Sequence, residues 1–297
     1  MRSLKNEPEI IYHYTGIESL RGILESQSLW ATDFHFLNDC RELFIFRDLL
    51  RNELLSRADA ITKAIVYGVL DGIYGMLENM NDPLALQIYI SSFSTVRDLL
   101  SQWRGYGQYA IGFDYKKLDA LRTKEFHQYK KVVKFSFFDD VVYGVVNRIP
   151  QELEKDVDEI LNILRQYSPY EEKKRRQCTE KFLRCMCRFK HEGFLEKNEY
   201  RLVFFCLRSE LNKPRAKEIK YRNVCGTLVP YIVLFAQNDE EVRLPIKEII
   251  IGPSRDTDLR IRSVEEFLEK LEIEAKVSES GIPYRGEITG AGTDIGI

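Results

Sequence analysis

Short runs that favour β-strands are separated by two long stretches that favour helices, and this order is what most constrains the fold. The runs LQIYISSFS, NEYRLVFFC and IKEIIIGP are rich in β-branched and aromatic residues, as strands are. Residues 41–80 and 150–190 instead repeat apolar positions three and four apart, which indicates helices. Because helices and strands do not alternate regularly, the pattern predicts an α+β fold with a mixed, mainly antiparallel sheet and helical insertions.

The chain is long enough for one sizeable core, since it has 297 residues of which 44% are hydrophobic. We expect a single domain over residues 1–285. A strand over Glu9–Tyr14 is expected to lead into a helix over Ile17–Glu25, which the capping-box spacing from Thr15 to Glu18 would start. Residues 286–297 are rich in glycine and poor in core-forming residues, so we expect a disordered tail.

The N-terminus and the cysteines bear on compartment and metal binding. The start MRSLKNEPEI lacks the apolar stretch of a signal peptide, and no window holds the roughly 18 uninterrupted apolar residues of a membrane span. We therefore expect a cytoplasmic protein without a membrane partner. The six cysteines are interpreted as reduced thiols. Cys185 and Cys187 have the wrong spacing for a zinc knuckle, so no metal site is predicted.

One segment stands out against the formal net charge of -2. The stretch from Tyr170 to Lys190 carries eight basic and three acidic residues, with apolar positions at helical spacing. It predicts an amphipathic helix with a basic face. Two interpretations stay open: a solvated helix face, or a surface that guides an anionic substrate such as RNA, DNA or a dinucleotide.

Three polar clusters lie at the ends of predicted strands, which is where sheet proteins often place ligand contacts. A glutamate that enters a run as apolar as YRLVFFC must face solvent, a partner or a pocket. A simple ion pair between Glu199 and Arg201, two residues apart on one strand face, is an alternative explanation. The clusters are His13-Tyr14-Thr15, Ser91-Ser92-Phe93-Ser94 and Asn198-Glu199-Tyr200-Arg201.

The order of short motifs resembles the bacterial family called domain of unknown function 2971. The motifs are HYT, LND with a following Glu, SFS, an Asp before WRGYG, IGFD, NEYR, IIIGP and SGIPYR. The resemblance runs over nearly the whole chain and is weakest across residues 44–85 and 145–195. That family is grouped with the ADP-ribosyltransferase-like fold, so the resemblance implies this fold and NAD as substrate.

The resemblance implies roles for residues that NAD chemistry would need. Breaking the glycosidic bond of NAD passes through an oxocarbenium-like state, which a carboxylate stabilises. Glu199 would take this role, and Ser94, with Ser92 as its alternate, would orient Glu199 or the ribose. His13 matches a first-strand histidine that hydrogen-bonds the adenosine ribose in one branch of the superfamily.

Further residues would complete the site. Trp103 or Tyr106 could stack on nicotinamide. The remaining candidates fall into two groups: Tyr14, Thr15 and Phe93 for NAD binding, and Asn38, Asp39, Glu42 and Arg201 for the acceptor or the surroundings of the glutamate. Asn38 is equally well explained as a helix cap.

These expectations lead to an ADP-ribosyltransferase that modifies an intracellular macromolecule, in the setting of a bacterial toxin or phage-defence effector with an antitoxin or defence-system partner. Arginine-modifying relatives in the superfamily carry two glutamates separated by one residue, whereas position 197 is Lys. This departure and the basic helix together slightly favour a nucleic-acid acceptor such as RNA or DNA over a protein. The alternatives are an NAD glycohydrolase and a non-catalytic nucleotide-binding sensor or interaction module.

Overall fold

The computed structural model describes residues 7–37, 40–79, 82, 84–166, 171–236 and 243–284, with only the backbone for 40–42. The predictions for Asn38, Asp39, the side chain of Glu42 and the tail 286–297 lie outside the described residues.

Ten described strands form one sheet in the order β12-β11-β4-β1-β3-β2-β10-β9, and β8 joins β3 to β5. Every strand pair in it is antiparallel except β11 with β12. The mixed, mainly antiparallel α+β prediction is therefore confirmed. The strands are β1 (Ile10–Thr15), β2 (Leu29–Asp33), β3 (Leu86–Ser94), β4 (Tyr109–Asp114), β5 (Val133–Asp140), β8 (Glu199–Leu207), β9 (Lys220–Val224), β10 (Thr227–Leu234), β11 (Ile246–Ile251) and β12 (Lys276–Glu279), with β6 (Val142–Gly144) and β7 (Phe189–His191) as a separate parallel pair.

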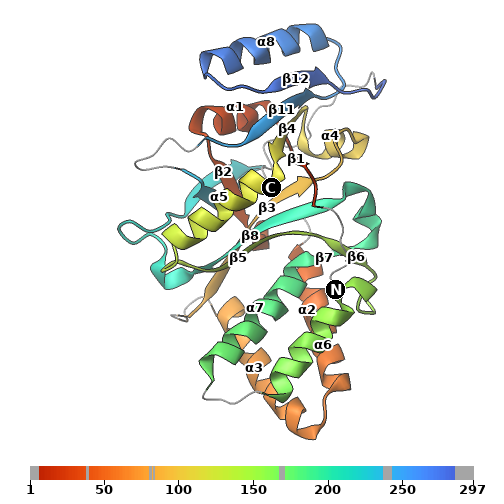
Figure 1. Cartoon of the computed structure of the whole chain (residues 1–297), viewed down its shortest axis with the longest axis vertical. Coiled ribbons are helices and arrows are strands. Elements are labelled where there is room, and N and C mark those ends of the chain that lie inside the picture. Colours follow the sequence, from red (N-terminus) through yellow and green to blue (C-terminus); the bar gives the residue numbers. More distant parts are fainter. Residues whose placement is uncertain are drawn as a thin grey trace.

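Four helices from the two predicted helical stretches gather at one end of the molecule (Figure 1). They are α2 (Cys40–Arg57), α3 (Ala60–Glu78), α6 (Gln151–Arg165) and α7 (Glu172–Arg188). Their apolar faces share one core cluster with Ile88 and Ile90 of β3 and with Val203 and Phe205 of β8. The two sequence insertions thus build a single helical layer against one face of the central strands.

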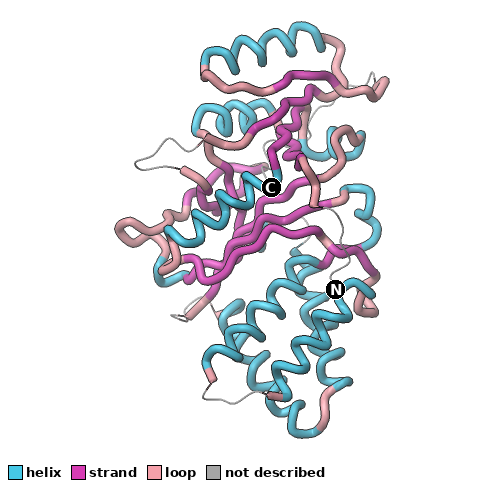
Figure 2. The backbone as a smooth tube through the Cα atoms, viewed as in Figure 1, coloured by secondary structure: helices cyan, strands magenta, loops and turns pink. Residues whose placement is uncertain are grey.

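The opposite face of the same strands carries the alternate residues, as the two-residue period of a strand requires. Tyr89 and Phe93 of β3 and Leu202 and Phe204 of β8 belong to a second cluster. The helices α1 (Ile17–Ser26), α5 (Tyr115–Gln128) and α8 (Thr257–Lys270) contribute to it, and Figure 2 shows them lying apart from the four-helix layer. The central strands are consequently buried on both faces, which explains their nearly continuous apolar runs.

Two helices were not predicted, and one cap differs from the prediction. Helix α5 extends from Tyr115 to Gln128 and precedes β5. The glycine-rich stretch before β4 contains α4 (Leu100–Tyr106). Helix α1 is confirmed, but Gly16 is its N-cap without a side-chain hydrogen bond, so the Thr15 capping box is wrong. Thr15 ends β1 instead and is drawn into the sheet.

Helix α3 is long and apolar enough, by length and composition, to cross a membrane. The core helix of a soluble protein can pass the same test. One of its faces, which includes Val66, Leu70 and Ile73, lies in the core cluster shared with the other three helices. The packing of this face accounts for part of its apolar character.

Asp98 fastens the loop after β3 to the C-terminal part of the described chain. Its carboxylate accepts hydrogen bonds from Trp103 Nε1 and Ser280 Oγ, both at 2.7 Å, and from the Gly281 amide at 2.7 Å. Asp98 is the aspartate before the WRGYG motif, and Ser280 and Gly281 begin the SGIPYR motif. The two motifs are therefore joined by one structural contact. They hold α4 beside β1 and set the rim of the cleft described below.

Gly107 permits a close approach that another residue would block. Its φ is +130°, and an added Cβ would lie 2.6 Å from the Thr15 carbonyl oxygen. We expect Gly107→Ala to lower the free energy of unfolding by about 2 kcal/mol, through backbone strain and the clash. Gly105→Ala is the matched control, because a Cβ there meets nothing within 4 Å and alanine favours a helix. Urea unfolding measures both; equal stabilities would contradict the expectation.

Candidate functional site

The pairing register of three strands brings the predicted polar clusters together. Ser94 of β3 lies opposite Glu199 of β8 and opposite Tyr12 of β1, while Ser92 lies opposite Arg201. His13 follows Tyr12 on β1. The clusters, distant in sequence, therefore meet where these strands adjoin.

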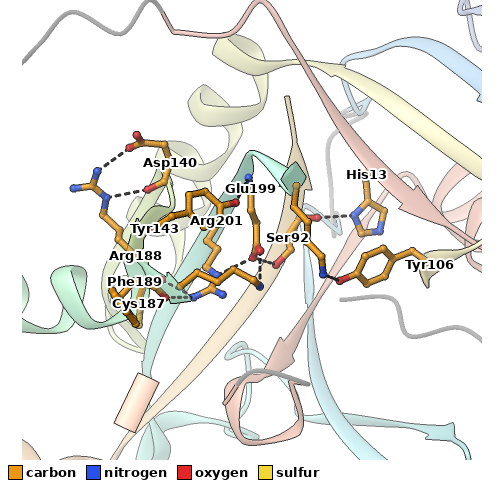
Figure 3. A network of polar contacts seen from close by, with 12 residues as sticks. His13, Ser92, Tyr106, Asp140, Tyr143, Cys187, Arg188, Phe189, Glu199 and Arg201 are labelled. Atoms are coloured by element: carbon orange, nitrogen blue, oxygen red, sulfur yellow. Dashed lines mark hydrogen bonds and ion pairs between the residues drawn. The ribbon is translucent and has the colours of Figure 1, made fainter. Parts of the chain in front are cut away.

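Glu199 is the centre of the polar network in Figure 3. Its Oε1 accepts hydrogen bonds from Ser92 Oγ at 2.9 Å and from Arg201 Nε at 2.8 Å. Its Oε2 lies 2.7 Å from Lys190 Nζ, and its backbone amide donates to the Tyr143 hydroxyl at 2.8 Å. The carboxylate is 7% exposed, so two cations and one hydroxyl fix an almost buried charge in one orientation.

Arg201 is a structural member of this network. Its side chain is 1% exposed, and besides Glu199 it donates from Nη1 to the Cys187 carbonyl at 2.9 Å. The predicted ion pair between Glu199 and Arg201 is thus present. It ties β8 to the end of α7, and Arg201 points away from solvent. Of the two roles expected for Arg201, the structure supports a place beside the glutamate and not a direct contact with an acceptor.

The two serines have different partners. Ser92 donates to Glu199, whereas Ser94 donates to the Lys197 carbonyl at 2.6 Å and accepts from the Val96 amide at 3.0 Å. The expectation that Ser94 orients the glutamate is therefore corrected. Both serines lie on the strand face of Glu199 and Arg201, but only Ser92 Oγ is directed at the Glu199 carboxylate, while Ser94 braces the chain that follows.

His13 lies on the other side of Ser92 from Glu199 (Figure 3). Its Nδ1 is 3.0 Å from the Ser92 carbonyl oxygen. A carbonyl only accepts, so Nδ1 carries the proton and Nε2 is left as an acceptor. Burial lowers the pKa of this imidazole, with a smaller opposing effect from the Ser92 carbonyl and a further lowering by Arg222.

The lowered pKa of His13 predicts a pH dependence of stability. The folded state holds the ring neutral, while in the unfolded chain the imidazole has its ordinary pKa of 6.5. Its contribution is complete above that pH and is lost as pH falls below it, by at most about 1.4 kcal/mol per pH unit. Urea unfolding of wild type and His13→Gln between pH 8 and pH 5 checks this: the wild type should lose more stability on acidification, and parallel curves would contradict it.

A cleft connects His13 to Glu199 and has about 320 Å³ of empty space. Tyr106 of α4 and Lys197 of η2 (Glu192–Lys197) meet over it, since Lys197 Nζ donates to the Tyr106 hydroxyl at 2.8 Å. Lys197 Nζ also lies 5.0 Å from the Tyr106 ring centroid. The Tyr106 side chain forms part of the cleft lining.

The other predicted NAD contacts divide into lining and supporting residues. Tyr14 and Phe93 line the cleft, although Tyr14 donates to the Val96 carbonyl at 2.8 Å and Phe93 packs 5.5 Å from the His13 ring. Trp103 is fully buried against Tyr14, 4.6 Å between ring centroids, and cannot stack on a ligand as proposed. Thr15 is 1% exposed and lies outside the cleft lining. Both corrections follow from the Asp98 and Gly107 contacts that seal α4 on β1.

The basic face of α7 is largely neutralised within the protein. Lys181 pairs with Glu159 at 2.5 Å, Arg184 with Asp139 at 2.6 Å and Arg188 with Asp140 at 2.7 Å. Two of these partners lie on β5 and one on α6. This part of the helix is a packing surface, which weakens the argument for a nucleic-acid partner.

Comparison with known families gives one result for the middle of the chain. Residues 102–202 match the family of proteins of unknown function DUF2971. The DUF2971 match covers about a third of the chain and includes most of α4 with Tyr106, as well as Lys190, Glu199 and Arg201. It supports the DUF2971 resemblance drawn from the motifs. Searches among curated proteins and among solved structures found no match.

The site contains residues to which sequence analysis assigned no role in it. Lys190 and Tyr143 both touch Glu199, and Lys197 bridges to Tyr106. Lys190 directly follows Phe189, and both residues are buried. A lysine beside a core-forming aromatic residue was a usable signal, because a buried lysine needs an anionic partner. No local pattern marks Tyr143, whose role depends on the pairing of β6 with β7 beside β8.

Proposed function

We propose that this protein is an NAD-dependent ADP-ribosyltransferase with an ADP-ribosyltransferase-like fold. The observation that carries the proposal is the fixed carboxylate of Glu199 in a cleft that also holds a neutral His13. The cleft has an aromatic side chain at its rim, Tyr106. These are the kinds of groups that cleavage of the nicotinamide glycosidic bond needs.

Each group has a defined role in the proposal. Glu199 accepts a hydrogen bond from the nicotinamide ribose and stabilises the positive charge that develops on it. Ser92 and Lys190 hold the carboxylate in one orientation. His13 accepts from a ribose hydroxyl through Nε2, and Tyr106 offers a ring to nicotinamide once Lys197 moves aside.

A glycohydrolase would use the same residues with water as acceptor. A non-catalytic nucleotide-binding module is the second candidate, and one observation favours it: both oxygens of Glu199 already have partners within the protein. An enzyme must therefore exchange at least one of these contacts for the ribose. In the binding module they stay intact.

The acceptor is proposed to be an intracellular macromolecule. The slight preference for nucleic acid now rests mainly on Lys197, which stands where arginine-modifying relatives carry a second glutamate. The ion pairs of α7 weaken the other argument, which is the basic face of that helix. Protein and nucleic acid are consequently both included in the test.

NAD labelled in its adenylate part tests the proposal. The protein is incubated with it alone, with cellular RNA and DNA, and with cell extract. Label on a macromolecule supports the transferase and identifies the acceptor class. Free ADP-ribose as the only labelled product supports the glycohydrolase, and intact NAD in every reaction contradicts both enzyme functions.

A further inference from the structure

His13 also forms part of a second cavity, which has about 310 Å³ of empty space. This cavity and the cleft at Glu199 share His13 in their linings. A ligand that reached both would therefore pass His13. The lining residues are His13, Ser19, Gly22, Ile23, Trp30 and Arg222.

Arg222 of β9 is held in a fixed position at this cavity. Its Nη2 donates to Thr32 Oγ1 of β2 at 2.8 Å. Its guanidinium carbon lies 5.6 Å from the Trp30 ring centroid and 5.7 Å from that of Tyr231, and these two rings stack 4.4 Å apart. Cation–π contacts and the threonine bond preorganise the guanidinium, whose planar fork suits phosphate oxygens.

The cavity therefore has two complementary polar groups. Among the described residues His13 Nε2 has no hydrogen-bond partner, and the ring is 5% exposed, so this nitrogen can accept from a hydroxyl. Arg222 supplies donors with a positive charge. Ile23 and Trp30 add apolar walls. A hydroxyl acceptor beside a cationic donor fork matches a ribose that carries a phosphate.

We propose that Arg222 binds the phosphate of a ribose phosphate whose hydroxyl contacts His13. The inference rests on the proposed function in one respect: the ribose phosphate is assigned to the adenosine half of NAD. The phosphate has two sources with the same chemistry: the 5′-phosphate of the pyrophosphate bridge, or a 2′-phosphate as in NADP. Adenosine monophosphates distinguish them.

Isothermal titration of adenosine, 5′-AMP and 2′-AMP tests the proposal with wild type, Arg222→Gln and Arg262→Gln. Arg262 is an exposed arginine on α8 paired with Glu266, so its replacement removes the same charge away from the cavity. Wild type and Arg262→Gln should bind one of the two monophosphates at least about tenfold more tightly than adenosine, as a charge-assisted hydrogen bond provides. In Arg222→Gln the ratio of the affinity for the monophosphate to the affinity for adenosine should fall to about one, while the affinity for adenosine is retained.

Thermal unfolding shows whether Arg222→Gln is folded. If it is not, Arg222→Lys replaces it: the charge remains but the planar fork is lost, and the preference should drop about three- to tenfold. Equal affinity of wild type for adenosine and both monophosphates overturns the proposal. An unchanged preference in the Arg222 variant overturns it too.

The test is independent of NAD cleavage. If the phosphate preference depends on Arg222 but NAD is never cleaved, the phosphate site stands and the enzyme proposal fails. If NAD is cleaved and the preference does not depend on Arg222, the phosphate site fails alone. If the Arg222-dependent preference is for 2′-AMP, Arg222 binds a phosphate on the ribose 2′ position, beside the hydroxyl that contacts His13. If it is for 5′-AMP, Arg222 binds the phosphate of the pyrophosphate bridge.

Discussion

Glu199→Gln is expected to slow nicotinamide release from NAD by a factor of about 10²–10³, the usual effect of removing one electrostatic stabiliser of a transition state. The same change leaves the buried cations Lys190 and Arg201 without their anion. Stability should therefore fall as well, by about 3–5 kcal/mol. Initial rates and urea unfolding of the same preparations measure both effects.

A double variant separates the catalytic effect from the loss of stability. Lys190→Met together with Glu199→Gln removes one cation and one anion, so the local net charge equals that of the wild type. Lys190 is 5% exposed, and an unbranched Met side chain is similar in length to Lys and can fill the same buried space. We expect the double variant to regain most of the lost stability and to remain inactive. Recovery of activity together with stability would assign Glu199 a purely structural role.

Arg201→Leu is expected to lower the free energy of unfolding by about 3–5 kcal/mol. It removes a fully buried partner of Glu199 and leaves the Cys187 carbonyl without its donor. Arg176→Leu is the matched control, since Arg176 pairs with Glu180 at 2.7 Å but is 66% exposed. Such exposed pairs contribute less than about 1 kcal/mol. Urea unfolding of both variants should differ clearly, and similar losses would contradict the burial argument.

The strands of the central sheet were predictable because both of their faces are buried. Runs such as YRLVFFC read as strands from their apolar, β-branched and aromatic content alone. Helix α5 was missed because six of the fourteen residues of YKKLDALRTKEFHQ are charged and its apolar periodicity is weak. Asp114 was a usable signal, since it caps this helix by accepting from the Lys117 amide at 3.0 Å.

The candidate site was predictable as separate clusters but not as an arrangement. His13, Ser92 and Glu199 stood out as polar residues at strand ends. The choice of Ser92 over Ser94 depends on the side chain's rotamer and on the Lys197 carbonyl, which no sequence pattern specifies. Trp103 stood out as an aromatic residue near glycines, yet the Asp98 contact buries it. Tertiary packing decided both cases.

The rate of nicotinamide release from NAD is the measurement that tests the central claim most directly. It is compared between wild type and the Lys190→Met, Glu199→Gln double variant at a temperature where unfolding curves show both to be folded. The proposed function predicts steady release by the wild type and at least a hundredfold slower release by the double variant. A loss of about this size is typical when one contact to the transition state is removed. No release by the wild type, or equal release by both proteins, would contradict it.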